Sequence, residues 1–252
     1  MKKAFIKIKA NIIEVKVRRC CDMFILKIIL GVSSLFILHS IIPTYYNKKI
    51  NKKAIRKTKN KNEIMLTFDD GPDERYIYKL AKVLEDNDVH ATFFMVAQNA
   101  QKNPEIVKFL QKKGHKIGLH SWQHKNAMLY SYFYTKKDFE NSTYIMKKLG
   151  VEDLFYRPPW GHTNIFSLNF VKKYNMKLIY WDVMAEDWSS KSTPEMIYEK
   201  LMLRTSSNSI ICLHDAGENS GGAKDAPLNT IEALKKAIPS LKEKGYKFVL
   251  PE

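Results

Sequence analysis

The segment "IMLTFDDGPD", residues 64–73, decides how the rest of the chain is interpreted, because an apolar run ends there in two adjacent carboxylates. Neighbouring side chains of an extended strand point to opposite sides. Asp69 and Asp70 are therefore predicted to do different work, one as a ligand and the other as a free carboxylate. The alternative is a plain strand followed by a turn, since Asp, Gly and Pro are common turn residues.

Short apolar runs of strand type alternate with helix-type patterns from residue 63 to the C-terminus. Strands are predicted over residues 64–68, 91–96, 116–119, 154–156, 177–181, 209–213 and 247–250. Helices are predicted over residues 77–86, 104–113, 136–149, 165–174, 194–203 and 228–244. This alternation implies a parallel sheet covered by helices, and about seven βα units predict an α/β fold of the distorted (β/α) barrel type.

Five polar clusters follow predicted strands, and a (β/α) barrel brings such strand ends to one face, where active sites assemble. The clusters are DDG at 69–71, HSWQH at 120–124, RPPWG at 157–161, AEDW at 185–188 and LHD at 213–215. Each cluster alone has an ordinary interpretation, but their shared position predicts a single site.

His120 and His124 have a spacing at which a short turn can direct both imidazoles to one point. A carboxylate from the Asp69–Asp70 pair would complete two imidazoles and one carboxylate, the ligand set of catalytic zinc sites. The alternative is a solvated pair of surface histidines.

Two prolines follow Arg157, and proline has no backbone N–H, so Trp160 provides the first main-chain donor after them. A rigidly held donor beside a metal suits a developing oxyanion. The alternative is a stiff corner in which Arg157 forms a surface ion pair.

His214 ends an apolar run, and Asp187 is a candidate partner that would keep its imidazole protonated. The alternative is a core histidine bonded to a carbonyl.

The net charge of +16 comes from the N-terminal quarter of the chain. Residues 1–61 contain 16 Lys and Arg against 2 Asp and Glu, whereas residues 62–252 contain 26 against 24. Nucleic-acid binding requires a basic face on the folded domain, so it is not expected here.

Residues 24–42, "FILKIILGVSSLFILHSII", are almost entirely apolar, and as a helix they would extend about 28 Å, close to the thickness of a bilayer core. No small-residue cleavage site follows, which favours an anchor over a removed signal peptide. We therefore predict a basic tail over 1–22, a transmembrane anchor over 23–42, a basic, solvated linker over 43–62 and a catalytic domain over 63–252. Lysines and arginines flank the span on both sides, so charge does not decide its orientation.

With its five motifs in order, TFDDG, HSWQH, RPPWG, EDW and LHD, the chain over residues 62–252 resembles the NodB-like polysaccharide deacetylases of carbohydrate esterase family four. The resemblance implies that Asp69 is the general base and that Asp70, His120 and His124 form a metal triad. Arg157 would orient the base, and Trp160 would be the oxyanion donor. His214 would be the general acid, with Asp187 as its partner. Trp188, Cys212 and Leu213 are expected around the acetyl pocket, Cys212 standing where the family usually has Leu.

The resemblance also implies metal-dependent removal of N-acetyl groups, with Zn²⁺ as the expected metal and Co²⁺ or Ni²⁺ as alternatives. Peptidoglycan is the expected polymer, because it lies next to the membrane; chitin-like or poly-N-acetylglucosamine chains are alternatives. An inactive anchored sugar-binding protein and an amidase for small amides are further hypotheses. We expect a monomeric, single-pass membrane protein whose catalytic domain is extracytoplasmic, because its substrate lies outside the cell.

Overall fold

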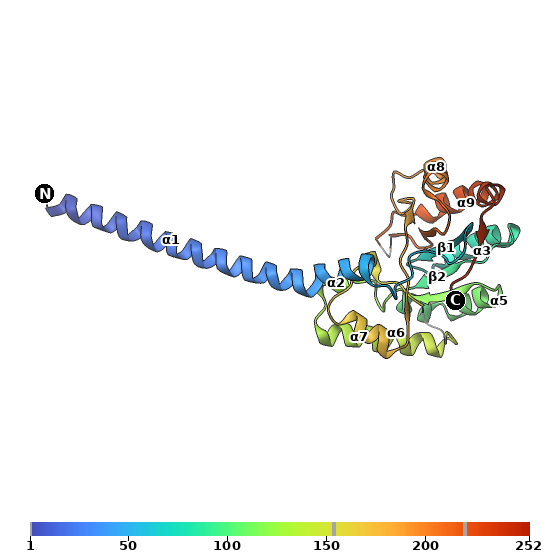
Figure 1. Cartoon of the computed structure of the whole chain (residues 1–252), viewed down its shortest axis with the longest axis horizontal. Helices are drawn as coiled ribbons and strands as arrows, with labels where there is room; N and C mark the ends of the chain where they lie inside the picture. The colour runs from blue at the N-terminus through green and yellow to red at the C-terminus, as the bar shows by residue number, and fades with distance from the viewer. Residues whose placement is uncertain (1, 153–154, 219–220) are drawn as a thin grey trace.

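The computed structural model describes residues 2–152, 155–218 and 221–252, with a long N-terminal helix leading into a folded domain (Figure 1). The strands are β1 (Glu63–Asp69), β2 (Thr92–Met95), β3 (Lys116–Leu119), β4 (Phe155–Tyr156), β5 (Lys177–Leu178), β6 (Val183–Met184), β7 (Ile210–His214) and β8 (Lys247–Phe248). The longer helices of the domain are α3 (Glu74–Asp86), α4 (Ala97–Lys102), α5 (Pro104–Lys112), α6 (Tyr132–Lys148), α7 (Ser167–Lys173), α8 (Pro194–Arg204) and α9 (Ala226–Glu243). Two short 3₁₀ turns, η3 (Ala127–Leu129) and η4 (Pro159–Gly161), complete the domain.

The strands form a parallel sheet in the order β5-β4-β3-β2-β1-β7-β6, and β8 pairs with the beginning of β1. β5 and β6 are consecutive in the chain but lie at opposite ends of this order, so the sheet curls without closing between them. This confirms the predicted distorted (β/α) barrel. The register sets Asp69, at the end of β1, beside His214, at the end of β7.

The main core lies between the sheet and its helices, and a smaller apolar cluster fills the inside of the curl. Met65, Phe94, Phe155, Ile179 and Ile210 make up this inner cluster, and all are buried. The inner cluster fills the lower part of the curl, which leaves the carboxyl ends of the strands for polar side chains.

Helix starts follow ordinary capping chemistry. Asp73 accepts the N–H of Arg75 at the start of α3, and Thr193 accepts the N–H of Met196 at the start of α8. Sequence patterns missed α4 and the two-residue β6, and β6 is too short for any periodicity to be recognised. Leu154, the predicted first residue of β4, lies outside the described residues.

The N-terminal helix consists of α1 (Lys2–Phe36), the π-helical segments η1 (Ile37–Ile41) and η2 (Tyr46–Ile50), and the turn α2 (Ile42–Tyr45) between them. It therefore continues past the predicted anchor and into contact with the domain (Figure 1). The Ser40 hydroxyl donates to the carbonyl of Met128 at 2.6 Å, and the Thr44 hydroxyl donates to the carbonyl of Thr163 at 2.8 Å.

The segment expected to be a solvated linker packs against the domain instead. Ile55 pairs with Ile179 beside β5, and the Thr58 N–H donates to the carbonyl of Asn208 before β7. Ala54 is buried, and Ile55 packs against the inner apolar cluster. Residues 55–58 thus cross the gap between the two ends of the sheet, from β5 to the start of β7, because an open edge leaves backbone groups and apolar side chains that need partners.

Candidate active site

The base candidate Asp69 is held by a completely buried arginine. Arg157 Nη1 donates to Asp69 Oδ1 and to Thr67 Oγ1, each at 2.7 Å. Arg157 Nη2 donates to the carbonyl of Tyr180 at 3.2 Å, and its guanidinium lies 4.1 Å from the centre of the Phe94 ring. The arginine predicted to orient Asp69 therefore does so from the interior of the barrel, and the alternative of a surface ion pair is wrong.

Three groups with metal-ligating atoms converge next to Asp69. Asp70 Oδ1 lies 3.0 Å from His124 Nε2 and 3.4 Å from His120 Nε2. The ligand atoms of Asp70, His120 and His124 all lie within 4.8 Å of one another. Two imidazoles and one carboxylate at this separation fit a divalent metal with an open coordination position.

The hydrogen bonding of His120 and the charge of Asp70 also suit a bound cation. His120 Nδ1 lies 2.7 Å from the carbonyl of Arg157 and donates to it, which leaves Nε2 free as a ligand. Burial alone would raise the pKa of the Asp70 carboxyl, but hydrogen bonds with His120 and His124 hold it well below its ordinary value. Asp70 is therefore ionised at neutral pH.

The backbone conformation at Asp70 directs the two aspartates differently from the strand alternation predicted for them. Asp69 is the last residue of β1, but Asp70 has left the extended conformation, with a φ of 85°. Both carboxylates consequently line the same cavity, and neither faces away from it. The following Gly71 has no room for a side chain, because a Cβ there would lie 2.2 Å from Asp215 Oδ2.

Asp138 and Asp215 hold the loops that carry the ligands. Asp138, on α6, accepts the N–H of Trp122 at 3.1 Å, and burial raises the pKa of its carboxyl to about 7. Asp215 accepts the N–H of Gly71 at 2.9 Å, and burial raises its pKa well above the ordinary value. Asp215 could have been found from the sequence, because it belongs to the LHD motif. Asp138 could not, because nothing in the sequence distinguishes it from other acidic residues on helices.

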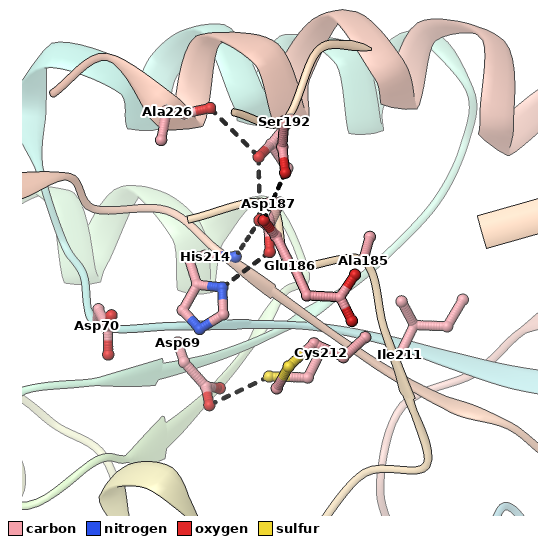
Figure 2. Close-up of polar contacts among 12 residues, drawn as sticks. Asp69, Asp70, Ala185, Glu186, Asp187, Ser192, Ile211, Cys212, His214 and Ala226 are labelled. Atoms are coloured by element: carbon pink, nitrogen blue, oxygen red, sulfur yellow. Dashed lines mark hydrogen bonds and ion pairs between the residues drawn. The ribbon is translucent and has the colours of Figure 1, made fainter. Parts of the chain in front are cut away.

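His214 and Asp187 form the predicted acid pair (Figure 2). Asp187 accepts from His214 Nδ1 at 2.9 Å and from the His214 backbone N–H at 2.8 Å. Burial by itself lowers the pKa of His214, but the charge of Asp187 and its hydrogen bond raise the pKa to about 10. The imidazole is therefore protonated at neutral pH, and it lines the cavity instead of being bonded to a core carbonyl.

A cavity of about 200 Å³ collects these groups. The predicted residues that line it are Asp69, Asp70, His120, His124, Trp160, Trp188, Cys212 and His214. Residues not predicted as part of the site also line it, namely Trp181, Met184, Gly221 and Gly222. The last two belong to the loop between β7 and α9, of which residues 219 and 220 lie outside the described residues.

Cys212 and Leu213 lie on opposite faces of β7. Cys212 Sγ is 3.4 Å from Asp69 Oδ2, so the thiol contacts the base candidate and also lines the cavity (Figure 2). Burial raises the pKa of this thiol well above its ordinary value, which keeps it a neutral donor. Leu213 belongs to the main core, so its expected place beside the acetyl pocket is wrong; strand alternation gives that place to its neighbours.

Trp160 lies at the edge of the cavity. Its ring is 4.6 Å from that of His124, and its backbone has a φ of 54°, a strained conformation for a side-chain-bearing residue. Lys48 donates to the Trp160 carbonyl at 2.8 Å, although it comes from the N-terminal helix. A Cβ on the next residue, Gly161, would lie 2.3 Å from the Lys48 side chain. No sequence signal predicted this contact.

The model of the polysaccharide deacetylase family matches residues 56–179, and a curated relative extends the similarity over most of the domain. That relative, a peptidoglycan-N-acetylglucosamine deacetylase from Bacillus cereus, is 33% identical over 192 residues, which is 75% of this chain and 86% of the relative. The chain belongs to the polysaccharide deacetylase family. It is therefore a hydrolase that acts on amide bonds, as the resemblance implied.

Two further members of the family are similar to this deacetylase. The crystal structure of the Bc1960 peptidoglycan N-acetylglucosamine deacetylase, in complex with 4-naphthalen-1-yl-N-oxidanyl-benzamide, has a TM-score of 0.70 and 32% identity, covering 78% of this chain and 89% of that one. PdaC from Bacillus subtilis, a peptidoglycan-N-acetylmuramic acid deacetylase, is 29% identical over 81% of this chain and 44% of its own length.

Proposed function

We propose that this deacetylase removes acetyl groups from N-acetylglucosamine units of peptidoglycan, with a divalent metal held by Asp70, His120 and His124. One observation carries the proposal: a held carboxylate, a triad of metal-ligating atoms and a protonated histidine all line one small cavity. Zn²⁺ is the metal that this ligand set favours, and Co²⁺ and Ni²⁺ are the alternatives.

The chain's own residues divide the proton transfers of amide hydrolysis. Asp69, oriented by the Arg157 guanidinium, takes a proton from the attacking water. His214, protonated and oriented by Asp187, donates a proton to the departing sugar amine, and acetate is released. A bound divalent metal supplies Lewis acidity at the acetamide carbonyl and lowers the pKa of water. The backbone N–H of Trp160 is the proposed donor to the developing oxyanion.

The acetyl methyl group would enter the apolar side of the cavity. Trp188 lies edge-on to His214, with ring centres 5.2 Å apart, and Cys212, in the middle of β7, lines the same cavity. A cavity of this size has room for an acetyl group. The names of the relatives support peptidoglycan as the polymer, with chitin-like and poly-N-acetylglucosamine chains as the alternatives.

We also propose that the N-terminal helix anchors the enzyme in the cell membrane, with the catalytic domain outside. The helical stretch Asp22–Ile50 is long and apolar enough to cross a bilayer, a test that signal sequences also pass. Beside its domain end, Leu129 and Phe133 expose 76% and 79% of their surface. Such exposed apolar side chains next to an apolar helix suit the surface of a bilayer.

Acetate release from purified full-length protein tests the function. Peptidoglycan, glycol chitin and small acetamides are supplied in parallel, before and after metal removal by a chelator. We expect the highest rate with peptidoglycan, loss of activity with the chelator and recovery with Zn²⁺. Acetate release from small acetamides alone, or from no substrate, would contradict the proposal. Protease treatment of spheroplasts tests the orientation, because an extracytoplasmic domain is degraded without lysis.

A further inference from the structure

A second hollow, of about 550 Å³, adjoins the active-site cavity. Trp181 and Met184 line both spaces, so the two are neighbours across these side chains. The hollow differs from the cavity in its charge, because five basic side chains and one carboxylate line it. These are Lys48, Lys49, Arg56, Lys57, Arg204 and Asp182.

Only part of this positive charge is neutralised within the protein. Lys57 pairs with Asp182, and Arg204 pairs with Glu186 at 2.6 Å. Within the described part of the chain, no carboxylate pairs with Lys48, Lys49 or Arg56. Three uncompensated cations therefore remain at this side of the cavity.

Two of the three cations are fixed in place by neutral partners. Arg56 donates to the backbone carbonyls of Asn47 at 2.9 Å and Asn51 at 2.7 Å, and also to that of Lys48. Lys48 is held by the Trp160 carbonyl. Carbonyl groups orient a cation without cancelling its charge, so the hollow has a built-in positive potential. Lys49 is exposed and free to reach into it.

We propose that this hollow binds a carboxylate carried by the sugar next to the one that is deacetylated. The proposal rests on the proposed function and narrows its substrate class to an anionic glycan. Peptidoglycan meets this requirement, because its alternate sugars carry a lactyl ether and a short peptide with free carboxylates. Chitin-like chains have no such group and would leave the cations unpartnered.

Charge reversal at Lys49 tests the subsite in the full-length protein. Lys49→Glu is compared with Lys53→Glu, a matched control on the same segment whose exposed side chain does not line the hollow. Both are assayed by acetate release on peptidoglycan and on uncharged N-acetylglucosamine oligomers, at low and high salt. For Lys49→Glu we expect kcat/KM on peptidoglycan to fall about tenfold at low salt and less at high salt. Its value on the neutral oligomers should equal that of the wild type, and Lys53→Glu should match the wild type on both.

Three results would overturn the subsite. The first is an equal effect of Lys49→Glu on charged and neutral substrates. The second is unchanged hydrolysis of peptidoglycan together with an activity loss only in vesicles of anionic lipid, which would assign the charges to lipid headgroups. The third is a wild-type protein that releases acetate from the neutral oligomers but not from peptidoglycan. Absence of acetate from both polymers with the wild-type protein would instead overturn the proposed function itself, and the subsite with it.

Discussion

The carboxylate of Asp187 accepts both the side-chain Nδ1 and the backbone N–H of His214, at 2.9 and 2.8 Å. Asp187 is buried, and its Oδ2 also accepts from Thr230 on α9 at 3.0 Å. The acid of the proposed mechanism is therefore fixed in direction and in charge by one residue. That residue comes from the loop after β6, a strand that sequence patterns did not reveal.

Asp187→Asn should move the alkaline limit of activity to lower pH. The pKa of His214 is raised to about 10 by Asp187, so the acid stays protonated across the neutral range and is lost as the pH rises through that value. Without the Asp187 carboxylate, burial still lowers the pKa of His214 and only the charges of Asp70 and Asp69 still raise it, so the pKa falls. A pH profile of kcat measures the shift; an unchanged alkaline limit would show that another group sets it.

His214→Ala should retain bound metal and lose turnover by about 10²-fold or more, because the leaving amine then lacks its proton donor. Metal content by elemental analysis and acetate release are measured on the same sample. Turnover equal to that of the wild type would remove His214 from the mechanism.

The two adjacent aspartates should fail in different ways. Asp70→Asn removes the charged member of the metal triad, so metal occupancy should fall and excess metal should restore some activity. Asp69→Asn keeps all three ligands but cannot accept the water proton, so it should bind metal normally and be nearly inactive at any metal concentration. Equal loss of metal in both variants would contradict this division of roles.

Lys48→Met should lower kcat on neutral N-acetylglucosamine oligomers by about tenfold, with little change in KM, because the Trp160 backbone loses a fixed partner. Lys49→Met is the control, since it removes the same charge from the neighbouring position without that contact. Partial rescue in Lys48→Arg would support a hydrogen-bonding role. Identical kcat values for Lys48→Met and Lys49→Met would rule it out.

The folded unit should begin before residue 61. A fragment that starts at residue 61 lacks Ile55 and its pairing with Ile179, so the gap between the two ends of the sheet is left uncovered. We expect this fragment to unfold several degrees below a fragment of residues 43–252, because it loses both backbone hydrogen bonds and apolar burial. Thermal unfolding of the two fragments measures the difference; equal midpoints would restore the boundary at 63.

The sequence was sufficient to predict those site residues whose side chains are of catalytic type and which stand at the end of a strand. Asp69, His120 and His214 each follow or end an apolar strand, so a parallel barrel necessarily brings them to one face. The sequence was insufficient where backbone conformation or long-range packing decides. The φ of 85° at Asp70 turns its carboxylate to the same side as that of Asp69, which an alternating strand cannot do.

The N-terminal segment shows the same limit more clearly. Its lysines and asparagines are typical of solvated chain, yet Asn47 is buried and donates to Thr163 Oγ1 at 3.0 Å. Composition describes what a segment would prefer in isolation. It does not show that the curled sheet leaves an edge near Ile179 that this segment can cover.

The helix that enters the domain without a break also limits where the enzyme can work. Ser40 and Thr44 fasten that helix to the loops around Met128 and Thr163, so no flexible tether separates the proposed anchor from the catalytic cavity. With the helix in a bilayer, the cavity would stay at a constant height and move only as the whole protein diffuses laterally. A tethered enzyme modifies a layer as deep as its tether is long. This arrangement would instead confine deacetylation to one thin plane of the polymer, nearest the membrane.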